Sequence, residues 1–214
     1  MFNGIILDVD GVLLDSNLLK EENIRAAAAP FTTSEKLTEF LDYFTGLNGV
    51  PREMKVEHFF GNNTETSKKI LCDYGERNAH SLNSVKETEG SLDFLKYWNN
   101  LKPMWAVSGG AQEEVRKTLQ TKQMDLYLEI IYGGPSSKAD NIKKIKNSQN
   151  FIFFGDSKHD HEVALEFNME FVFLTKYTQF NDWQAYFSQY PEVEIRTHLA
   201  EWLNNYKLNQ KPNL

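Results

Sequence analysis

The sequence predicts an α/β protein with a doubly wound parallel sheet and an inserted helical domain. Three observations support this prediction. Short apolar runs alternate with helical patterns over most of the chain, small or acidic residues follow several of these runs, and one long stretch contains helical patterns alone. Alternation of this kind is typical of parallel sheets with helical crossovers.

The first predicted strand covers residues 4–8, where three apolar residues precede an aspartate and Gly11 interrupts the pattern. Three later runs, at 104–107, 151–154 and 171–174, have the same continuous apolar character. Such runs are typical of strands that are buried on both faces of a sheet. We therefore expect these four segments to be neighbours in one Rossmann-like sheet.

Helical patterns separate the predicted strands. Apolar residues recur at helical spacing over residues 91–100, 112–120, 139–146 and 161–167. In a parallel sheet built from such units, the ligand site lies beyond the carboxyl ends of the strands. Side chains at those ends are therefore the first candidates for function.

Residues 16–88 contain no convincing strand and four candidate helices. These helices are predicted at 18–29, 35–44, 52–60 and 65–74. Thr32 and Glu35 have the spacing of a capping box before the second one. We expect a helical domain over 16–88, inserted into a core domain that comprises residues 1–15 and 89–214.

Composition narrows the classes of function. The net charge of −7 disfavours a non-specific nucleic-acid binder, which needs clustered Lys and Arg. No apolar run has the length of a membrane span or the form of a signal peptide. Cys72 is the single cysteine, so no internal disulfide can form, and we expect it to be a buried apolar residue. The default expectation is a cytoplasmic protein, with no prediction of its oligomeric state.

The strongest chemical signal is the segment DVDGVLLDS, which directly follows the first predicted strand. Asp8 and Asp10 face one cavity only if the backbone turns between them and Gly11. One carboxylate can then attack a substrate while the other transfers protons. This division of labour requires the two pKa values to differ.

This segment resembles the first motif of the haloacid dehalogenase superfamily, phosphatase branch. Later segments match its other motifs in order: VSG at 107–109, Lys138 in SKAD, and GDSKHD at 155–160. The helical insertion resembles the family's cap of the first type, as in phosphoglycolate phosphatases and β-phosphoglucomutases. The resemblance therefore covers nearly the whole chain and implies a Rossmann-like core with a helical cap domain.

The resemblance implies a role for each matched acidic residue. Asp8 would be the nucleophile, and Asp10 would protonate the leaving oxygen and then activate water. The carboxylates of Asp8 and Asp156 and the backbone carbonyl of Asp10 would bind Mg²⁺, which favours oxygen ligands. Asp160 would hold the loop and contact Lys138 or a metal-bound water.

The resemblance also implies a phosphate-binding set. Ser108 and Gly109 would bind the transferring phosphoryl group, and Lys138 would neutralise its charge. Four aspartates near a phosphate dianion would repel it, which is why a divalent ion and an ammonium are needed. Lys143 and Lys144 are the alternatives to Lys138, but they lie inside a predicted helix.

Arg52 follows a glycine-containing turn in GLNGVPRE, a segment that resembles the cap of the family's sugar-phosphate members. Its guanidinium would suit a distal anionic or hydroxyl group of the substrate. A solvated arginine near the start of a helix explains the same position equally well. Both interpretations of Arg52 stay open at this stage.

The function that the resemblance implies is Mg²⁺-dependent hydrolysis of small phosphomonoesters, such as sugar phosphates, through an aspartyl-phosphate on Asp8. A phosphomutase of the same fold is the nearest alternative. A non-catalytic phosphoryl-acceptor domain of the receiver type is an alternative from another class. Asp10 and the helical insertion favour the phosphatase, because a receiver lacks this acid and base.

Overall fold

The computed structural model describes residues 2–145 and 150–209 and contains one six-stranded sheet. All the strand pairs are parallel, in the order β3-β2-β1-β4-β5-β6. The strands are β1 Gly4–Leu7, β2 Met104–Ala111, β3 Ile130–Gly134, β4 Phe151–Gly155, β5 Glu170–Leu174 and β6 Glu194–Arg196. The predicted fold class, a doubly wound parallel sheet with an inserted helical part, is confirmed.

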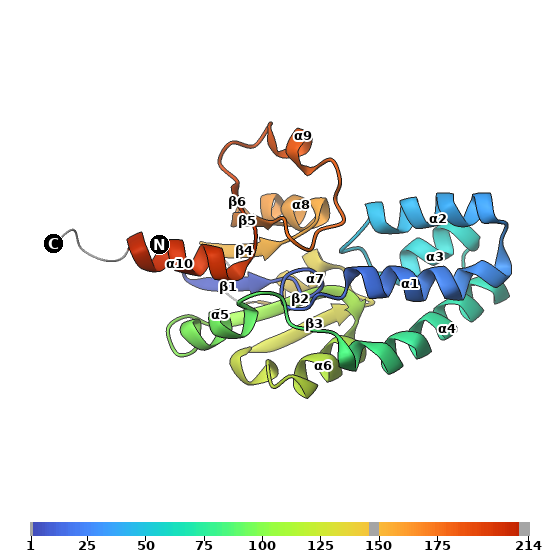
Figure 1. Cartoon of the computed structure of the whole chain (residues 1–214), viewed down its shortest axis with the longest axis horizontal. Coiled ribbons are helices and arrows are strands. Elements are labelled where there is room, and N and C mark those ends of the chain that lie inside the picture. Colours follow the sequence, from blue (N-terminus) through green and yellow to red (C-terminus); the bar gives the residue numbers. More distant parts are fainter. Residues whose placement is uncertain (1, 146–149, 210–214) are drawn as a thin grey trace.

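In the described part of the chain, six α-helices flank this sheet and four form a separate group (Figure 1). The flanking helices are α5 Ser91–Trp98, α6 Gln112–Thr121, α7 Lys138–Ile142, α8 Lys158–Glu166, α9 Trp183–Phe187 and α10 Leu199–Asn209. The group between β1 and α5 comprises α1 Asn17–Ala28, α2 Ser34–Gly46, α3 Arg52–Phe60 and α4 Glu65–Ser81. We call this group the helical lobe and the rest of the described chain the sheet lobe.

Alternation along the strands places apolar side chains on both faces of the sheet. In β1, Ile5 and Leu7 face α5, α6 and α10, whereas Ile6 faces α7, α8 and α9. On the first face, Trp202 of α10 packs edge-on against Phe154 of β4, with ring centroids 4.9 Å apart. The two buried faces explain why these strands read as continuous apolar runs.

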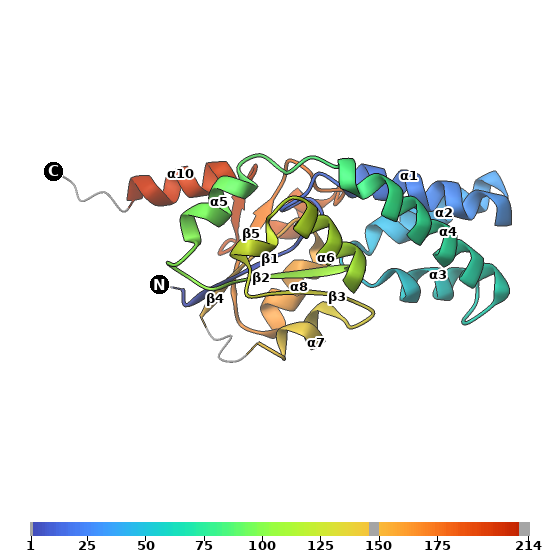
Figure 2. The ribbon, with the colours of Figure 1, turned by 90° about the horizontal axis from the view of Figure 1, so that it is seen from below.

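The helical lobe has a hydrophobic core of its own, built from all four of its helices. Ile24, Phe40, Val56 and Ile70 are each fully buried there. Both views show this lobe extending from one end of the sheet lobe, beyond the carboxyl ends of the strands (Figures 1 and 2). Its position places the inner surface of the helices over the predicted ligand site.

Two segments connect the lobes, and they run side by side. The backbone N–H of Asp15 donates to the carbonyl of Lys86, and that of Thr88 donates to the carbonyl of Leu13, each at 3.0 Å. These bonds lie close to the predicted boundaries at 15/16 and 88/89. The boundaries themselves stay a prediction.

Some details differ from the sequence-based expectations. Strands β3 and β6 were not predicted, and α7 ends at Ile142, whereas residue 146 of the predicted helix lies outside the described residues. The cap of α2 is Thr33, which accepts from the N–H of Lys36, and not Thr32. Cys72 is exposed on α4, so its predicted burial was wrong.

Within residues 2–145 and 150–209, no helix combines the length and the apolar character needed to cross a lipid bilayer.

Candidate active site

The carboxyl ends of β1, β2 and β4 bring the predicted site residues to one edge of the sheet. Asp8 directly follows β1, Ser108 lies within β2, and Asp156 directly follows β4. The neighbouring order β2-β1-β4 makes these three positions adjacent. Sequence segments that are about 50 to 150 residues apart therefore converge, as expected for a parallel sheet.

Three carboxylates form a buried cluster at this edge. Oxygen atoms of Asp8, Asp156 and Asp160 lie within 4.8 Å of one another. Each of these residues is at most 4% exposed. Charges of the same sign at this distance in a buried site repel strongly, so the cluster requires compensation by cations.

Lys138 supplies one of these cations. It is fully buried at the start of α7, and its Nζ lies 2.7 Å from Asp8 Oδ1 and 2.5 Å from Asp160 Oδ1. The competing candidates Lys143 and Lys144 are exposed. Of the three lysines, only Lys138 contacts the acidic cluster, as the sequence interpretation preferred.

Asp160 is held by the turn that begins α8. Its Oδ2 accepts from the N–H and the hydroxyl of Ser157, at 3.2 and 2.6 Å, while its own N–H donates to the Ser157 hydroxyl. This reciprocal arrangement is a capping box. The cap fixes the Asp160 carboxylate, which in turn contacts Lys138.

The pKa values in the cluster reflect the excess of negative charge. Burial, together with the charges of Asp160 and Asp10, raises the pKa of Asp8 to about 7 against the attraction of Lys138. Burial and the charges of Asp8 and Asp160 also raise the pKa of Asp156. Three acidic groups thus share one ammonium.

This donor set fits a divalent cation. The three ligand atoms are carboxylate oxygens, which Mg²⁺ prefers, and they are close enough together to surround one ion. A divalent cation would supply the positive charge that the cluster lacks and would favour the ionised form of Asp8. Asp8 and Asp156, two members of this cluster, are the carboxylates expected to hold it, and the part of the Asp10 backbone carbonyl stays a prediction.

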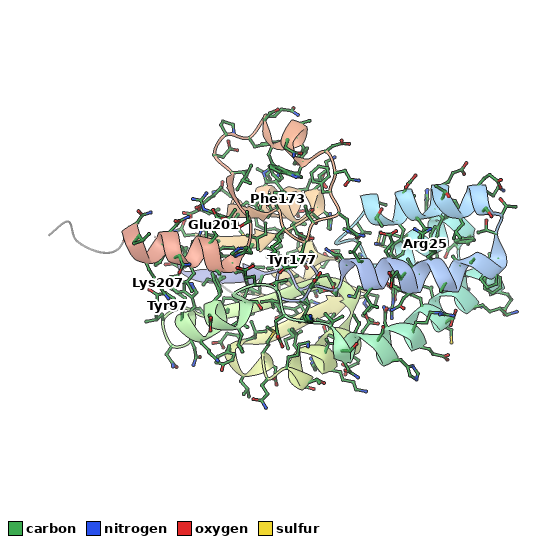
Figure 3. All side chains as sticks on the ribbon, in the orientation of Figure 1. Arg25, Tyr97, Phe173, Tyr177, Glu201 and Lys207 are labelled. Atoms are coloured by element: carbon green, nitrogen blue, oxygen red, sulfur yellow. The ribbon has the colours of Figure 1, made fainter. Side chains whose placement is uncertain are left out.

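Asn17, at the start of α1, was not singled out from the sequence. Its Nδ2 donates to Asp156 Oδ2 at 2.7 Å and to the carbonyl of Tyr177 at 2.9 Å. Tyr177 lies beside the start of α1, where the helical lobe meets the sheet lobe (Figure 3). Asn17 therefore orients one oxygen of Asp156, and only its place directly after the DVDGVLLDS segment marked it in the sequence.

Gly11 has a specific steric role in this arrangement. Its φ is +81°, and a Cβ at this position would lie 2.1 Å from Asp156 Oδ2. A side chain would therefore be strained by the backbone and would displace Asp156. The glycine of the first motif lets the loop after β1 approach the loop after β4.

Asp10 lies at the junction of the two lobes. The Ser16 hydroxyl donates to its Oδ1, and Lys20 Nζ lies 2.6 Å from Oδ1 and 2.8 Å from Oδ2. Burial opposes ionisation, but the charge and hydrogen bond of Lys20 outweigh it, so the pKa of Asp10 is lowered. Asp8 and Asp10 thus differ in pKa, and in this state Asp10 is the stronger acid.

The phosphate-binding residues predicted in β2 lie beside Asp10. The buried Ser108 hydroxyl is 3.3 Å from Asp10 Oδ2 and accepts from the N–H of Gly110 at 2.9 Å. Gly109 borders the cavity, and a Cβ there would lie 2.4 Å from the carbonyl of Gly49 in the helical lobe. The two lobes are therefore in close backbone contact at this point.

Arg52 points toward the site but is already paired. Its Nη1 lies 2.9 Å from Glu114 Oε2 of α6, and its guanidinium lies over the ring of Tyr74, 5.1 Å from the centroid. Asn78 also donates to Glu114, and Lys20 lies 3.8 Å from it. Glu114, which sequence reasoning did not select, thus joins one helix of the sheet lobe to three helices of the helical lobe.

A cavity of about 60 Å³ lies between the lobes and reaches both Asp8 and Asp156. Its wall contains acidic, basic, amide and backbone groups from both lobes. The lining residues are Asp8, Asp10, Asn17, Lys20, Glu21, Phe44, Thr45, Asn48, Gly49, Val50, Arg52, Lys55, Tyr74, Gly109, Gly110, Glu114, Asp156 and Gln179. The candidate active site is therefore enclosed by both lobes.

Solved structures with the same fold cover almost the whole chain. A predicted phosphatase from Clostridium acetobutylicum aligns with a TM-score of 0.77 and 18% identity, over 98% of this chain and 99% of that one. A predicted phosphoglycolate phosphatase from Haemophilus somnus gives 0.73 and 18%, over 98% of each chain. A putative β-phosphoglucomutase from Thermotoga maritima gives 0.64 and 18%, over 96% and 99%. At these identities the similarity establishes the fold.

The search of curated proteins gives no significant match. The family model described as "Haloacid dehalogenase-like hydrolase" matches residues 5–174, which include the residues of all four motifs. The resemblance seen in those motifs is confirmed: this chain belongs to the haloacid dehalogenase-like hydrolase family.

Proposed function

We propose that this protein is a Mg²⁺-dependent phosphatase that hydrolyses small phosphomonoesters through an aspartyl-phosphate on Asp8. The observation that carries the proposal is the buried cluster of Asp8, Asp156 and Asp160 around Lys138, with Asp10 two residues from the nucleophile. Relatives of the same fold that are described as phosphatases support it.

In the first step, Asp8 attacks phosphorus and the bond to the leaving oxygen breaks. Lys138 holds the Asp8 carboxylate in position, and the cluster's cation lowers the charge repulsion between carboxylate and phosphate when it is bound. Asp10 gives its proton to the leaving oxygen. The products are the alcohol and the acyl phosphate on Asp8.

In the second step, Asp10 takes a proton from water, which attacks the acyl phosphate and releases inorganic phosphate. The lowered pKa of Asp10 keeps its carboxylate ionised and therefore free to accept this proton. For the first step, Asp10 has to gain a proton. This requires the Lys20 ammonium to move away from the Asp10 carboxylate. Since Lys20 lies on α1, movement of the helical lobe would accompany that change.

We also propose that residues 16–88 act as a cap domain on a core of residues 1–15 and 89–214. The separate hydrophobic core of the helical lobe and the paired connecting segments support this division. A small phosphorylated metabolite would enter the cavity when the cap opens, and closure would exclude bulk water. Ser108, Gly109 and Lys138 would then surround the phosphoryl group.

Hydrolysis of p-nitrophenyl phosphate with Mg²⁺ and with EDTA tests the proposal. We expect turnover that requires the metal and is abolished by Asp8→Asn, because an amide cannot form the acyl phosphate. Asp15→Asn, an exposed aspartate of the same motif, is the matched control and should retain full activity. A protein that is phosphorylated once and never turns over would instead be a phosphoryl acceptor of the receiver type.

A further inference from the structure

Lys55 of α3 is a buried lysine in the wall of the active-site cavity. The residue is 4% exposed and lines the same cavity as Asp8 and Asp156. Its Nζ donates to the carbonyl of Phe44 at 3.1 Å and lies 3.7 Å from the centroid of the Phe44 ring. These two neutral contacts orient the ammonium without neutralising its charge.

The charge of Lys55 has no acidic partner among the described residues. The other three cations at the site are all paired: Lys20 with Asp10, Arg52 with Glu114, and Lys138 with Asp8 and Asp160. No carboxylate oxygen of residues 2–145 and 150–209 lies within 4.0 Å of Lys55 Nζ.

Burial of an ammonium without a counter-charge is unfavourable. The pKa of Lys55 falls to about 7 because of burial and the nearby charges of Lys20 and Lys138, against the attraction of Asp10 and Glu53. An ammonium has three donors, and only one of them has an acceptor among the residues that the structure describes. The structure thus keeps a costly group at a place where a ligand can provide the missing charge.

We propose that Lys55 binds a second anionic group of the substrate, separate from the phosphoryl group that Asp8 attacks. This inference rests on the proposed phosphatase function and specifies its substrate class: small phosphomonoesters that carry a carboxylate or a second phosphate. Because Lys55 and Asp8 line the same cavity, we expect a short spacer to join the two anionic groups.

This assignment differs from the sequence-based candidate for a distal anion, Arg52, for which two interpretations stayed open. Arg52 lies on the same helix, three residues earlier, but the carboxylate of Glu114 already takes its charge. A ligand anion at Arg52 would have to displace Glu114, whereas an anion at Lys55 displaces no charged group. Lys55 is therefore the specificity-determining residue for the second anionic group.

The test compares two substrates of nearly equal shape, phosphoglycolate and 2-hydroxyethyl phosphate, which differ in the carboxylate. We expect Lys55→Met to lower kcat/KM for phosphoglycolate about 10- to 100-fold, the usual effect of losing a charge-assisted hydrogen bond. The kcat/KM of Lys55→Met for 2-hydroxyethyl phosphate should stay within about 2-fold of that of the unaltered protein. Ethylene glycol bisphosphate, tested in parallel, shows whether a second phosphate is the preferred group.

Lys69→Met, at an exposed lysine of the same lobe, is the matched control and should change kcat/KM for neither substrate. Lys55→Gln provides a second variant if Lys55→Met does not fold. Equal losses for the charged and neutral substrates would overturn the inference, as would equal kcat/KM values for both in the unaltered protein. Activity on the neutral ester without preference for the charged one would refute the role of Lys55 and leave the proposed phosphatase function standing. Absence of all phosphatase activity would refute both proposals.

Discussion

Lys138 is the residue whose surroundings best explain the organisation of the site. Its ammonium lies between Asp8 and Asp160, and all three side chains are nearly or fully inaccessible to solvent. A buried ion pair is strongly destabilising when one partner is removed, because the other charge stays behind. The cluster is therefore a structural element of the protein as well as a chemical one.

We predict that Lys138→Met lowers the free energy of unfolding by about 3–5 kcal/mol, since it leaves the acidic cluster without its ammonium. Urea denaturation at neutral pH would measure this loss. Lys143→Met, on an exposed lysine, should change the value by no more than about 0.5 kcal/mol. Similar effects of the two substitutions would contradict the bridging role of Lys138.

Lys55 leads to a prediction about pH and stability. The unfolded chain keeps the Lys55 proton up to about pH 10.5, whereas the folded protein gives it up near pH 7. Between these values the unfolded state binds more protons, so the contribution of Lys55 to stability rises with pH. Below pH 7 the buried ammonium reduces stability by its full amount.

Lys55→Met should therefore stabilise the ligand-free protein, on the order of a few kcal/mol at pH 6, with a gain that shrinks toward pH 10. Chemical denaturation of both proteins across this pH range gives the difference. A gain that is independent of pH would mean that Lys55 titrates normally in the folded protein.

The sequence identified the residues that its motifs contain and missed those that act through tertiary contacts. Asp8, Asp10, Asp156 and Lys138 stand at strand or helix ends that apolar runs make visible. The structure brings Asp8, Asp156 and Lys138 together and places Asp10 beside Ser108. Asn17, Lys20, Lys55 and Glu114 belong to helices, where a polar residue is ordinary. Only packing of the two lobes shows that these four face the cavity.

Among the elements, the strands with continuous apolar runs were predictable and the edge strands were not. The run of β4 is buried throughout, whereas β3 contains two glycines and β6 has only three residues, none fully buried. Edge strands bury less side-chain surface, so their hydrophobic pattern is weak. The predicted helix 65–74 also ended too early, because α4 continues to Ser81 through mostly polar residues.

Helix α6 carries one electrostatic link between the lobes. Glu114 faces Arg52 and Asn78, and its side chain is only 10% exposed. Its neighbour Glu113 is 83% exposed and pairs only with Arg116 of its own helix. The two adjacent glutamates therefore provide an internal comparison.

We predict that Glu114→Gln lowers the free energy of unfolding by about 1–3 kcal/mol, because the largely buried Arg52 would keep only the more distant Glu53 as a counter-charge. Glu113→Gln should stay within about 0.5 kcal/mol, as is usual for exposed ion pairs. Guanidinium denaturation of both variants makes the comparison. Equal values would show that the Arg52–Glu114 pair does not join the lobes.

At the scale of the whole molecule, cation binding should stabilise the folded protein. Three buried carboxylates have oxygen atoms within 4.8 Å of one another, and this cluster forms only when β1, β4 and α8 are assembled. A cation that binds the cluster therefore favours the folded state by mass action. This effect can be observed without any substrate.

We predict that millimolar Mg²⁺ raises the Tm of the protein by several degrees, equivalent to about 1–3 kcal/mol, and that EDTA reverses it. Asp156→Asn should remove the increase, while Asp15→Asn should keep it. An increase that persists in Asp156→Asn would place the cation elsewhere.

The division of the chain into two hydrophobic cores has a consequence for spectroscopy. All four tryptophans, Trp98, Trp105, Trp183 and Trp202, belong to the sheet lobe, whereas the core of the helical lobe contains only phenylalanine and tyrosine as aromatic residues. Tryptophan emission therefore reports on the sheet lobe, and circular dichroism, dominated by helices, reports on both. Melting curves from the two signals would coincide only if the lobes unfold together.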